Sequence, residues 1–305
     1  MRKEYKPDDK FKRWARALQF AYREDVLHDF NEYRAPQVLL SEENAKRGLI
    51  FYDGFRNLIL NKVGNVSTQL TANMLRSEHI PYNLFTPLET MPEIAIDLFS
   101  KMIGVPIKQI RSIEIEYAGT GDKSMYLNDR TSFDAFVDYV TPMGRNGGIG
   151  IEVKYTENEY PLGEKEGKDI AGANHLYRDM TVESDYFTPD LDIKTFLTAH
   201  HLRQIWRIHI LGYSMLHKGD VDIIHHVHIY PEHNEHFHNL ALPEYRTLLT
   251  EKGNESFKTI TYEDYFKMLD CYRDNVGVSD WVKYLRKRYL GITSKLRTEI
   301  GNYYI

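Results

Sequence analysis

The spacing of apolar residues changes once along the chain, from a helical period to a period of two. In the first hundred residues apolar positions recur every three to four residues, which predicts helices over 11–30, 42–60, 68–76 and 92–102. Strict alternation then predicts strands over 111–117, 132–140 and 148–155, and a fourth strand over 221–230. Further helices are predicted over 198–216, 262–273 and 279–289. This order favours an α/β protein with a mixed sheet flanked by helices.

The alternation also assigns side chains to the two faces of the sheet. On the first strand, Ile113, Ile115 and Tyr117 are expected to share one face. The second and third strands flank the turn TPMGRNGG, and strands joined this closely form an antiparallel hairpin. A hairpin closed symmetrically around that turn places Tyr139 near Ile149.

The same hairpin gathers three charged side chains. Glu152 and Lys154 are two residues apart on one strand and therefore leave the same face. In the expected register Asp134 lies opposite or diagonal to them, within about 5–8 Å. The sequence therefore predicts a patch made of Asp134, Glu152 and Lys154.

Two convergent carboxylates and a lysine are suited to phosphodiester hydrolysis. Carboxylates are the hard oxygen ligands that Mg²⁺ prefers, and the lysine could position or deprotonate a metal-bound water or counter charge on the phosphate. The alternative is a solvent-facing hairpin with a surface ion pair. Glu-x-Lys occurs three times, at Glu4/Lys6, Glu152/Lys154 and Glu166/Lys168, but only the middle one lies on a predicted strand that follows a strand carrying a carboxylate.

Around these residues the sequence resembles the PD-(D/E)xK nuclease superfamily, and within it a bacterial branch of uncharacterised restriction-endonuclease-like proteins. The similar segments are ARALQFAYRED (15–25), NMLRSEHIPYNLFTPLE (73–89), EYAGTGDKSMYLNDRTSFDAFVDY (116–139), GIGIEVKYTE (148–157) and QIWRIHILGYSM (204–215). The resemblance implies a restriction-endonuclease-like α/β fold, an αβββαβ core whose mixed sheet is flanked by helices, with N- and C-terminal helical elaborations.

The resemblance also implies roles for individual residues. Asp134 and Glu152 would be metal ligands and Lys154 the catalytic lysine of the D…ExK signature, with Mg²⁺ or Mn²⁺ as cofactor and DNA as substrate. Glu78 would complete the metal site, although Glu114 or Glu116 could serve instead, and Gln204 would lie near the site. Phe133 stands where the motif's name has a proline. Many nucleases of this fold act as dimers, so the resemblance allows a homodimer.

Composition adds limits on partners and compartment. The 305 residues carry 39 Lys and Arg against 44 Asp and Glu, a net charge of −5, so attraction to nucleic acid must be local. The segment 281–297 is the candidate source of this attraction, since it is rich in basic and aromatic residues and lacks acidic ones. The alternative is an amphipathic helix with a solvated basic face. Its candidate contact residues are Lys283, Arg286, Lys287 and Arg288. The N-terminal helix, with Arg16, is a weaker second candidate. A lone cysteine, Cys271, and a charged N-terminus indicate a reducing, cytoplasmic compartment.

No repeat or linker divides the sequence, which favours a single elaborated domain over residues 1–305. Within it we expect a mainly helical part (1–105), a catalytic sheet core (106–232) and a C-terminal helical part (233–305).

Two other functions remain open at this point. The fold could be catalytically inactive and bind nucleic acid or a partner protein. Alternatively, the stretch 225–238, which holds six of the 13 histidines, could bind a structural zinc ion through His226 and His228 with His233 or His236.

Overall fold

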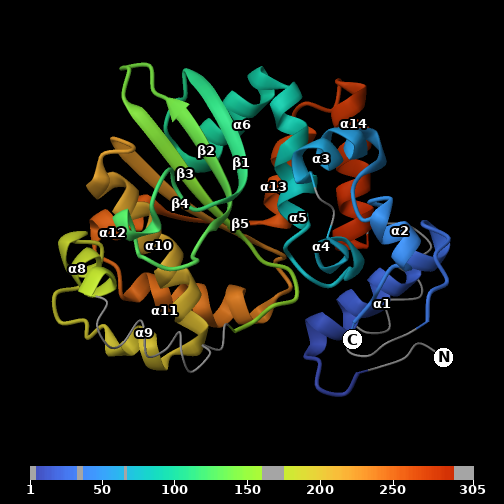
Figure 1. Cartoon of the computed structure of the whole chain (residues 1–305), viewed down its shortest axis with the longest axis horizontal. Coiled ribbons are helices and arrows are strands. Elements are labelled where there is room, and N and C mark those ends of the chain that lie inside the picture. Colours follow the sequence, from blue (N-terminus) through green and yellow to red (C-terminus); the bar gives the residue numbers. More distant parts are fainter. Residues whose placement is uncertain (1–4, 33–36, 65–66, 160–174, 292–305) are drawn as a thin grey trace.

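A five-stranded mixed sheet lies at the centre of the computed structural model, which describes residues 5–32, 37–64, 67–159 and 175–291 (Figure 1). The strands follow the order β1-β2-β3-β4-β5, with bounds Gln109–Tyr117, Phe133–Val140, Asn146–Val153, Ile223–Tyr230 and Phe257–Thr261. The first three strands are antiparallel neighbours, whereas β4 and β5 run parallel to β3. The predicted αβββαβ core is confirmed as α6 (Pro92–Ile103), β1, β2, β3, α10 (His200–Lys218) and β4.

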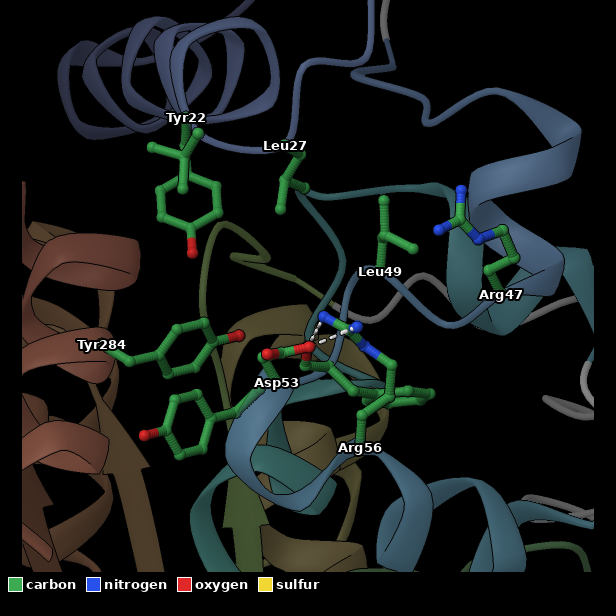
Figure 2. A pocket seen from close by; sticks show the side chains of 10 residues that line it. Tyr22, Leu27, Arg47, Leu49, Asp53, Arg56 and Tyr284 are labelled. Atoms are coloured by element: carbon green, nitrogen blue, oxygen red, sulfur yellow. Dashed lines mark hydrogen bonds and ion pairs between the residues drawn. The ribbon is translucent and has the colours of Figure 1, made fainter. Parts of the chain in front are cut away.

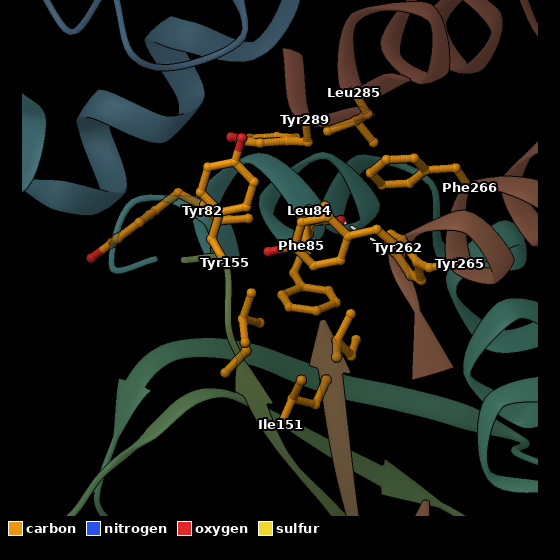
Figure 3. Packing of buried hydrophobic residues seen from close by; sticks show 14 of the residues in the cluster. Tyr82, Leu84, Phe85, Ile151, Tyr155, Tyr262, Tyr265, Phe266, Leu285 and Tyr289 are labelled. Atoms are coloured by element: carbon orange, nitrogen blue, oxygen red, sulfur yellow. Dashed lines mark hydrogen bonds between the residues drawn. The ribbon is translucent and has the colours of Figure 1, made fainter. Parts of the chain in front are cut away.

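Helices cover both faces of the sheet, because both faces are apolar. One face carries Val137, Ile151 and Val153, all fully buried. It packs against α1 (Lys10–Asp25), α5 (Ile80–Phe85), α6, α13 (Tyr262–Asp270) and α14 (Val276–Leu285). Figure 3 shows the aromatic layer between this face and the helices, in which Tyr155 and Tyr262 lie between Ile151 on the sheet and the side chains of Tyr289, Leu285 and Phe266. The opposite face packs mainly against α10, α8 (His175–Glu183), α9 (Lys194–Thr198) and α11 (Leu242–Thr247).

Glycines on β3 bring the neighbouring strand's aromatic rings close to the sheet. A methyl group on Gly150 would lie 2.2 Å from Cε1 of Phe133, and one on Gly148 would lie 2.6 Å from the ring of Phe136. Both contacts are too short for real atoms, so β3 must stay free of side chains at these two positions. On this face of β3, Glu152 is therefore the first side chain after two glycines.

The hairpin register differs from the symmetric one by two residues. Tyr139 pairs with Gly147 and not with Ile149, because the turn closes over 141–145 and β3 begins at Asn146. Gly144 adopts a positive φ of 79° and donates its backbone N–H to the Thr141 carbonyl, which makes this tight turn. A shift of two residues leaves every side chain on its predicted face.

Tyr117 lies on the other face from the one that the alternation predicts. Glu116, the residue before it, has a left-handed φ of 58°, which turns the end of β1. As a result Tyr117 stacks on Phe136, at 4.5 Å between ring centroids, while Ile113 and Ile115 keep to the expected face.

Several helix predictions need correction. The predicted helix over 42–60 is interrupted near Gly48, whose φ is 67°, and the first helix ends at Asp25 and not at residue 30. The strand β5 and the helices α5 and α8 were not predicted, since each is short or only partly apolar. No helix in the described ranges is long and apolar enough to cross a membrane. The remaining elements are α2 (Glu42–Lys46), η1 (Asp53–Phe55), α3 (Arg56–Val63), α4 (Thr68–Ala72), η2 (Thr86–Thr90), η3 (Lys123–Met125), η4 (His236–Ala241), α12 (Glu251–Ser256) and η5 (Arg286–Leu290).

Candidate active site

Asp134, Glu152 and Lys154 come together at the end of the β2–β3 hairpin. The ammonium Nζ of Lys154 lies 2.6 Å from Oε1 of Glu152, and both side chains are buried, at 7% and 1% exposure. Asp134 reaches the same strand, since its Oδ2 accepts a 2.6 Å hydrogen bond from the Val153 backbone N–H. The solvated surface ion pair considered as the alternative is therefore excluded for Glu152 and Lys154.

The helix α10 adds Gln204 to these three residues. Its Nε2 donates a 2.6 Å hydrogen bond to Oε1 of Glu152, the same oxygen that Lys154 approaches. The flanking residues Leu202, Ile205 and Trp206 are buried in the core, which fixes the helix against the strand. Gln204, which the resemblance implied would lie near the site, therefore contacts Glu152 directly.

Burial raises the pKa of both carboxyl groups. Although part of the Asp134 side chain reaches solvent, withdrawal of its carboxyl from water is the largest cause of a pKa well above the usual range, and the charge of Glu152 adds to it. Burial likewise raises the pKa of Glu152, even though Lys154 opposes the shift. Burial acts to lower the pKa of Lys154, but the charges of Glu152 and Asp134 outweigh it and the pKa lies above its usual value. Lys154 is therefore a cation at neutral pH.

Two further glutamates contribute to the same electrostatic field. Glu116 on β1 accepts a 3.1 Å hydrogen bond from Ser132 Oγ, and its pKa is raised by burial and by the charges of Glu152 and Glu78. Glu78, which the resemblance implied would complete the metal site, is ion-paired with Arg76 and lies in the turn before α5. The left-handed φ of Glu116 is the kind of backbone strain that often accompanies functional residues.

A model of the PD-(D/E)XK nuclease superfamily matches residues 6–291. The chain belongs to the PD-(D/E)XK nuclease superfamily. No curated protein and no solved structure matches the chain.

The residues that the resemblance assigned to the D…ExK signature are brought close together by the fold. Asp134 lies near the start of β2, Glu152 lies at the end of β3, and Lys154 directly follows that strand. Phe133, at the position of the proline in the superfamily's name, is fully buried with its ring over Gly150. The aromatic side chain there packs the hairpin face next to the site, so the departure from the motif has a structural role.

Glu157 was not assigned a role from the sequence, although it lies in one of the similar segments. Its Oε1 accepts a 2.7 Å hydrogen bond from the Ser77 backbone N–H, and its Oε2 accepts one of 3.1 Å from that of Tyr155. Next to it, Thr156 donates its hydroxyl hydrogen to the Leu75 carbonyl at 2.9 Å. These bonds tie the end of the ExK strand to the turn that carries Glu78.

Arg207 is a second neighbour that the sequence did not indicate. Its Nη2 lies 2.8 Å from both Asp129 Oδ2 and Thr131 Oγ1, and its Nε donates to the Tyr177 hydroxyl at 3.1 Å. The positive charge of Arg207 also acts on Glu152. No motif marks such a network, because its members are far apart in the sequence.

The predicted basic contact surface is only partly formed. Arg288 is completely buried, with its guanidinium over the rings of Tyr22 and Tyr289, so it cannot meet nucleic acid at the surface. Lys283 is exposed and Lys287 half-exposed, while Arg286 pairs with Asp270. Arg16 in the N-terminal helix is also buried, paired with Asp8. Lys295 and Arg297 lie outside the described residues.

The predicted zinc site is not formed. His226 and His228 share a strand face as expected, with ring centroids 6.5 Å apart, and both are buried among aromatic rings. Within the described ranges, which include all of 225–238, no group of three histidine, cysteine or acidic side chains is placed to hold a metal ion. His233 and His236 do not join the pair, because they follow Pro231 and leave the strand. Burial lowers the pKa of both strand histidines, which keeps them neutral core residues.

Proposed function

We propose that this protein is a metal-dependent nuclease that hydrolyses phosphodiester bonds, with DNA as the substrate. The observation that carries the proposal is the convergence of Asp134 with the buried pair Glu152 and Lys154 at the end of one hairpin, with Gln204 on Glu152. Membership of the superfamily supports the reaction class. Ionised carboxyl groups whose pKa is raised by withdrawal from water are costly for stability, and such costs are typical of functional sites.

The carboxylates fit a divalent cation. Within the described residues no hydrogen bond engages Asp134 Oδ1 or Glu152 Oε2, so one oxygen of each remains available as a ligand. Mg²⁺ needs few protein ligands, since it keeps water and takes phosphate oxygens from its substrate, so a third protein ligand is not required. Asp134 and Glu152 would hold Mg²⁺ or Mn²⁺, with Glu78 or Glu116 nearby. When bound, such an ion supplies positive charge to the phosphate and lowers the pKa of water.

The chain's own residues have separable roles in this proposal. Lys154, held as a cation by its carboxylate neighbours, stabilises the charge that develops on the phosphate, and this favours an electrostatic role over that of a general base. Gln204 fixes the orientation of Glu152 by donating to Oε1. The half-exposed or exposed cations Lys283, Lys287 and Arg286 would attract the nucleic-acid backbone.

A cleavage assay tests the proposal. Purified protein is incubated with supercoiled plasmid, linear duplex DNA, single-stranded DNA and RNA, in Mg²⁺, Mn²⁺ or EDTA. We expect metal-dependent cleavage of DNA that falls at least about a hundredfold in Asp134→Asn, Glu152→Gln and Lys154→Met.

Asp138→Asn is the matched control for the cleavage assay. Asp138 lies on the same strand as Asp134 and faces the same side of the sheet, but it is ion-paired with Arg111 at the surface. The Asp138→Asn variant should cleave DNA as fast as wild type does. Equal cleavage by wild type and all three site variants would contradict the proposal. Binding of DNA without cleavage under any condition would favour the inactive, binding-only alternative.

A further inference from the structure

A pocket of about 330 Å³ lies away from the catalytic residues, between the end of α1, the segment 49–56 and α14 (Figure 2). Its volume is at the lower end of the range of small-molecule sites, about 300–1,000 Å³. Tyr22, Tyr52 and Tyr284 provide aromatic walls, and Arg47 and Arg56 lie at its polar side. None of these residues has a role in the D…ExK site.

The aromatic walls retain accessible surface. Tyr52 and Tyr284 are half-buried, with ring centroids 4.7 Å apart and planes inclined by 33°. Tyr22 meets Tyr284 edge-on, with an interplanar angle of 80°. The Tyr284 hydroxyl donates to the Ile50 carbonyl at 3.2 Å, which fixes that ring on the pocket wall. Rings held in this way can stack against a planar ligand, and a nucleobase is such a ligand.

Polar groups with unused hydrogen-bonding capacity face the same space. In Figure 2 the Tyr22 hydroxyl points into the pocket, and within the described residues it has no hydrogen-bond partner. Arg56 pairs through Nη1 with Asp53 at 2.5 Å, but its Nε has no acceptor in the described part of the chain. A ligand that accepts hydrogen bonds would satisfy the Tyr22 hydroxyl, and its negative charge would be attracted by Arg56, whose Nε itself is buried.

The charge around the pocket favours an anion. Of the charged groups that line it, Asp53 pairs with Arg56, and Arg47 lies 3.9 Å from Glu43 outside the lining; the nearby Asp280 is paired with Lys283 at 2.9 Å. Arg288 adds a buried positive charge behind the wall, 4.8 Å from the centroid of the Tyr22 ring. The local charge is therefore positive although the whole chain carries −5.

We propose that this pocket binds a single nucleotide, with the base against Tyr52 and Tyr284 and the phosphate near Arg56, Arg47 and the Tyr22 hydroxyl. The same chemistry is present in a free mononucleotide and in an unpaired nucleotide of a strand. The site is distinct from the catalytic residues, because Tyr22 and Tyr284 pack on the sheet face opposite to Glu152. Tyr289 packs against both Tyr284 on the pocket wall and Tyr155, the residue after Lys154. The inference does not depend on the proposed nuclease activity.

Isothermal titration of the full chain in EDTA tests the inference, with AMP, adenosine, inorganic phosphate and a single-stranded oligodeoxyadenylate as probes. AMP should bind at one site per chain, and adenosine and phosphate should each bind at least about tenfold more weakly. Tyr22→Phe, which removes only the hydroxyl, should weaken AMP binding about fivefold. Arg56→Gln should weaken it about tenfold or more, because it also leaves Asp53 without its partner.

Two controls separate this pocket from other sites. Arg273→Gln removes an exposed arginine elsewhere on the surface, and Glu152→Gln alters the catalytic site; both should bind AMP like wild type. Tighter binding of the oligonucleotide that is lost in the same two pocket variants would assign the site to a strand, and binding of AMP alone would assign it to a free nucleotide. No binding of AMP or the oligonucleotide up to about 1 mM, or unchanged binding in both Tyr22→Phe and Arg56→Gln, would overturn the inference.

Discussion

The hydrogen bond from Gln204 to Glu152 leads to a specific kinetic prediction. Gln204→Met removes the donor and keeps a side chain of similar length, so Glu152 Oε1 retains only its contact with Lys154. A hydrogen bond to an ionised acceptor contributes about 1.5–3 kcal/mol, equivalent to about 10–150-fold in rate. Since Lys154 still holds the same oxygen, we expect the lower part of this range, a loss of about tenfold in kcat/KM.

The dependence on metal concentration identifies the cause of that loss. Residues that orient a metal ligand typically alter metal affinity or activity by about 10–100-fold when they are replaced. DNA cleavage by Gln204→Met should therefore need more Mn²⁺ for half-maximal rate, and raising the Mn²⁺ concentration should recover part of the activity. Initial rates across a Mn²⁺ titration, for wild type and variant in parallel, measure both effects.

Gln19→Met is a matched control, because Gln19 is also buried and donates from Nε2 to the Tyr155 hydroxyl at 2.8 Å and to the Arg288 carbonyl at 2.9 Å. It lies on the other side of the sheet, so it should lower the free energy of unfolding by about 1–2 kcal/mol and leave the Mn²⁺ dependence unchanged. The reasoning is refuted if Gln204→Met cleaves DNA with wild-type kcat/KM and Mn²⁺ dependence, or if Gln19→Met shifts that dependence equally.

Three other predictions concern stability. Because the pKa of Asp134 is raised on folding, its ionised form destabilises the metal-free fold at a pH above that raised pKa, and the penalty disappears as the pH falls towards the ordinary carboxyl value of about 4. Asp134→Asn should therefore raise Tm in EDTA more at pH 8 than at pH 5; a lower Tm at pH 8 would contradict this sign. Gly150→Ala should lower the free energy of unfolding by about 1–3 kcal/mol, because the added methyl group would lie 2.2 Å from Phe133. Urea denaturation measures this loss, and an unchanged midpoint would contradict the close contact. Glu157→Gln leaves one backbone N–H without an acceptor oxygen and should lower the free energy of unfolding by about 1–2 kcal/mol. Faster hydrogen exchange at the Ser77 amide would locate the effect, and an unchanged exchange rate would contradict the role given to the bond between Ser77 and Glu157.

The elements that follow from simple periodicity were predictable. The alternation of Ile149, Ile151 and Val153 with two glycines and Glu152 identified β3 and both of its faces, because a period of two survives an error of two in register. The strand β5 was not predicted, since only Phe257 is buried there and the other residues are half-exposed. Tyr117 lies on the opposite face because Glu116 has a left-handed φ. The sequence does not predict this conformation, since glutamate rarely adopts it.

The candidate site was predictable where it is local and not where it is assembled from distant segments. Asp134, Glu152 and Lys154 lie on two consecutive strands, so spacing alone brings them together. Glu157 acts through the Ser77 amide, 80 residues away, and no pattern in the sequence connects them. The basic run around Arg288 was misjudged for a related reason, because composition does not reveal which cation of a helix turns inward onto tyrosine rings.

The central claim is that Asp134 and Glu152 hold a divalent cation in a nuclease site. Anomalous diffraction from crystals soaked in Mn²⁺, at a concentration that supports DNA cleavage, tests it directly. We predict a strong anomalous peak at the Asp134 and Glu152 carboxylates, lost in crystals of Glu152→Gln. A principal peak at His226 and His228, or no peak at the two carboxylates, would contradict the account.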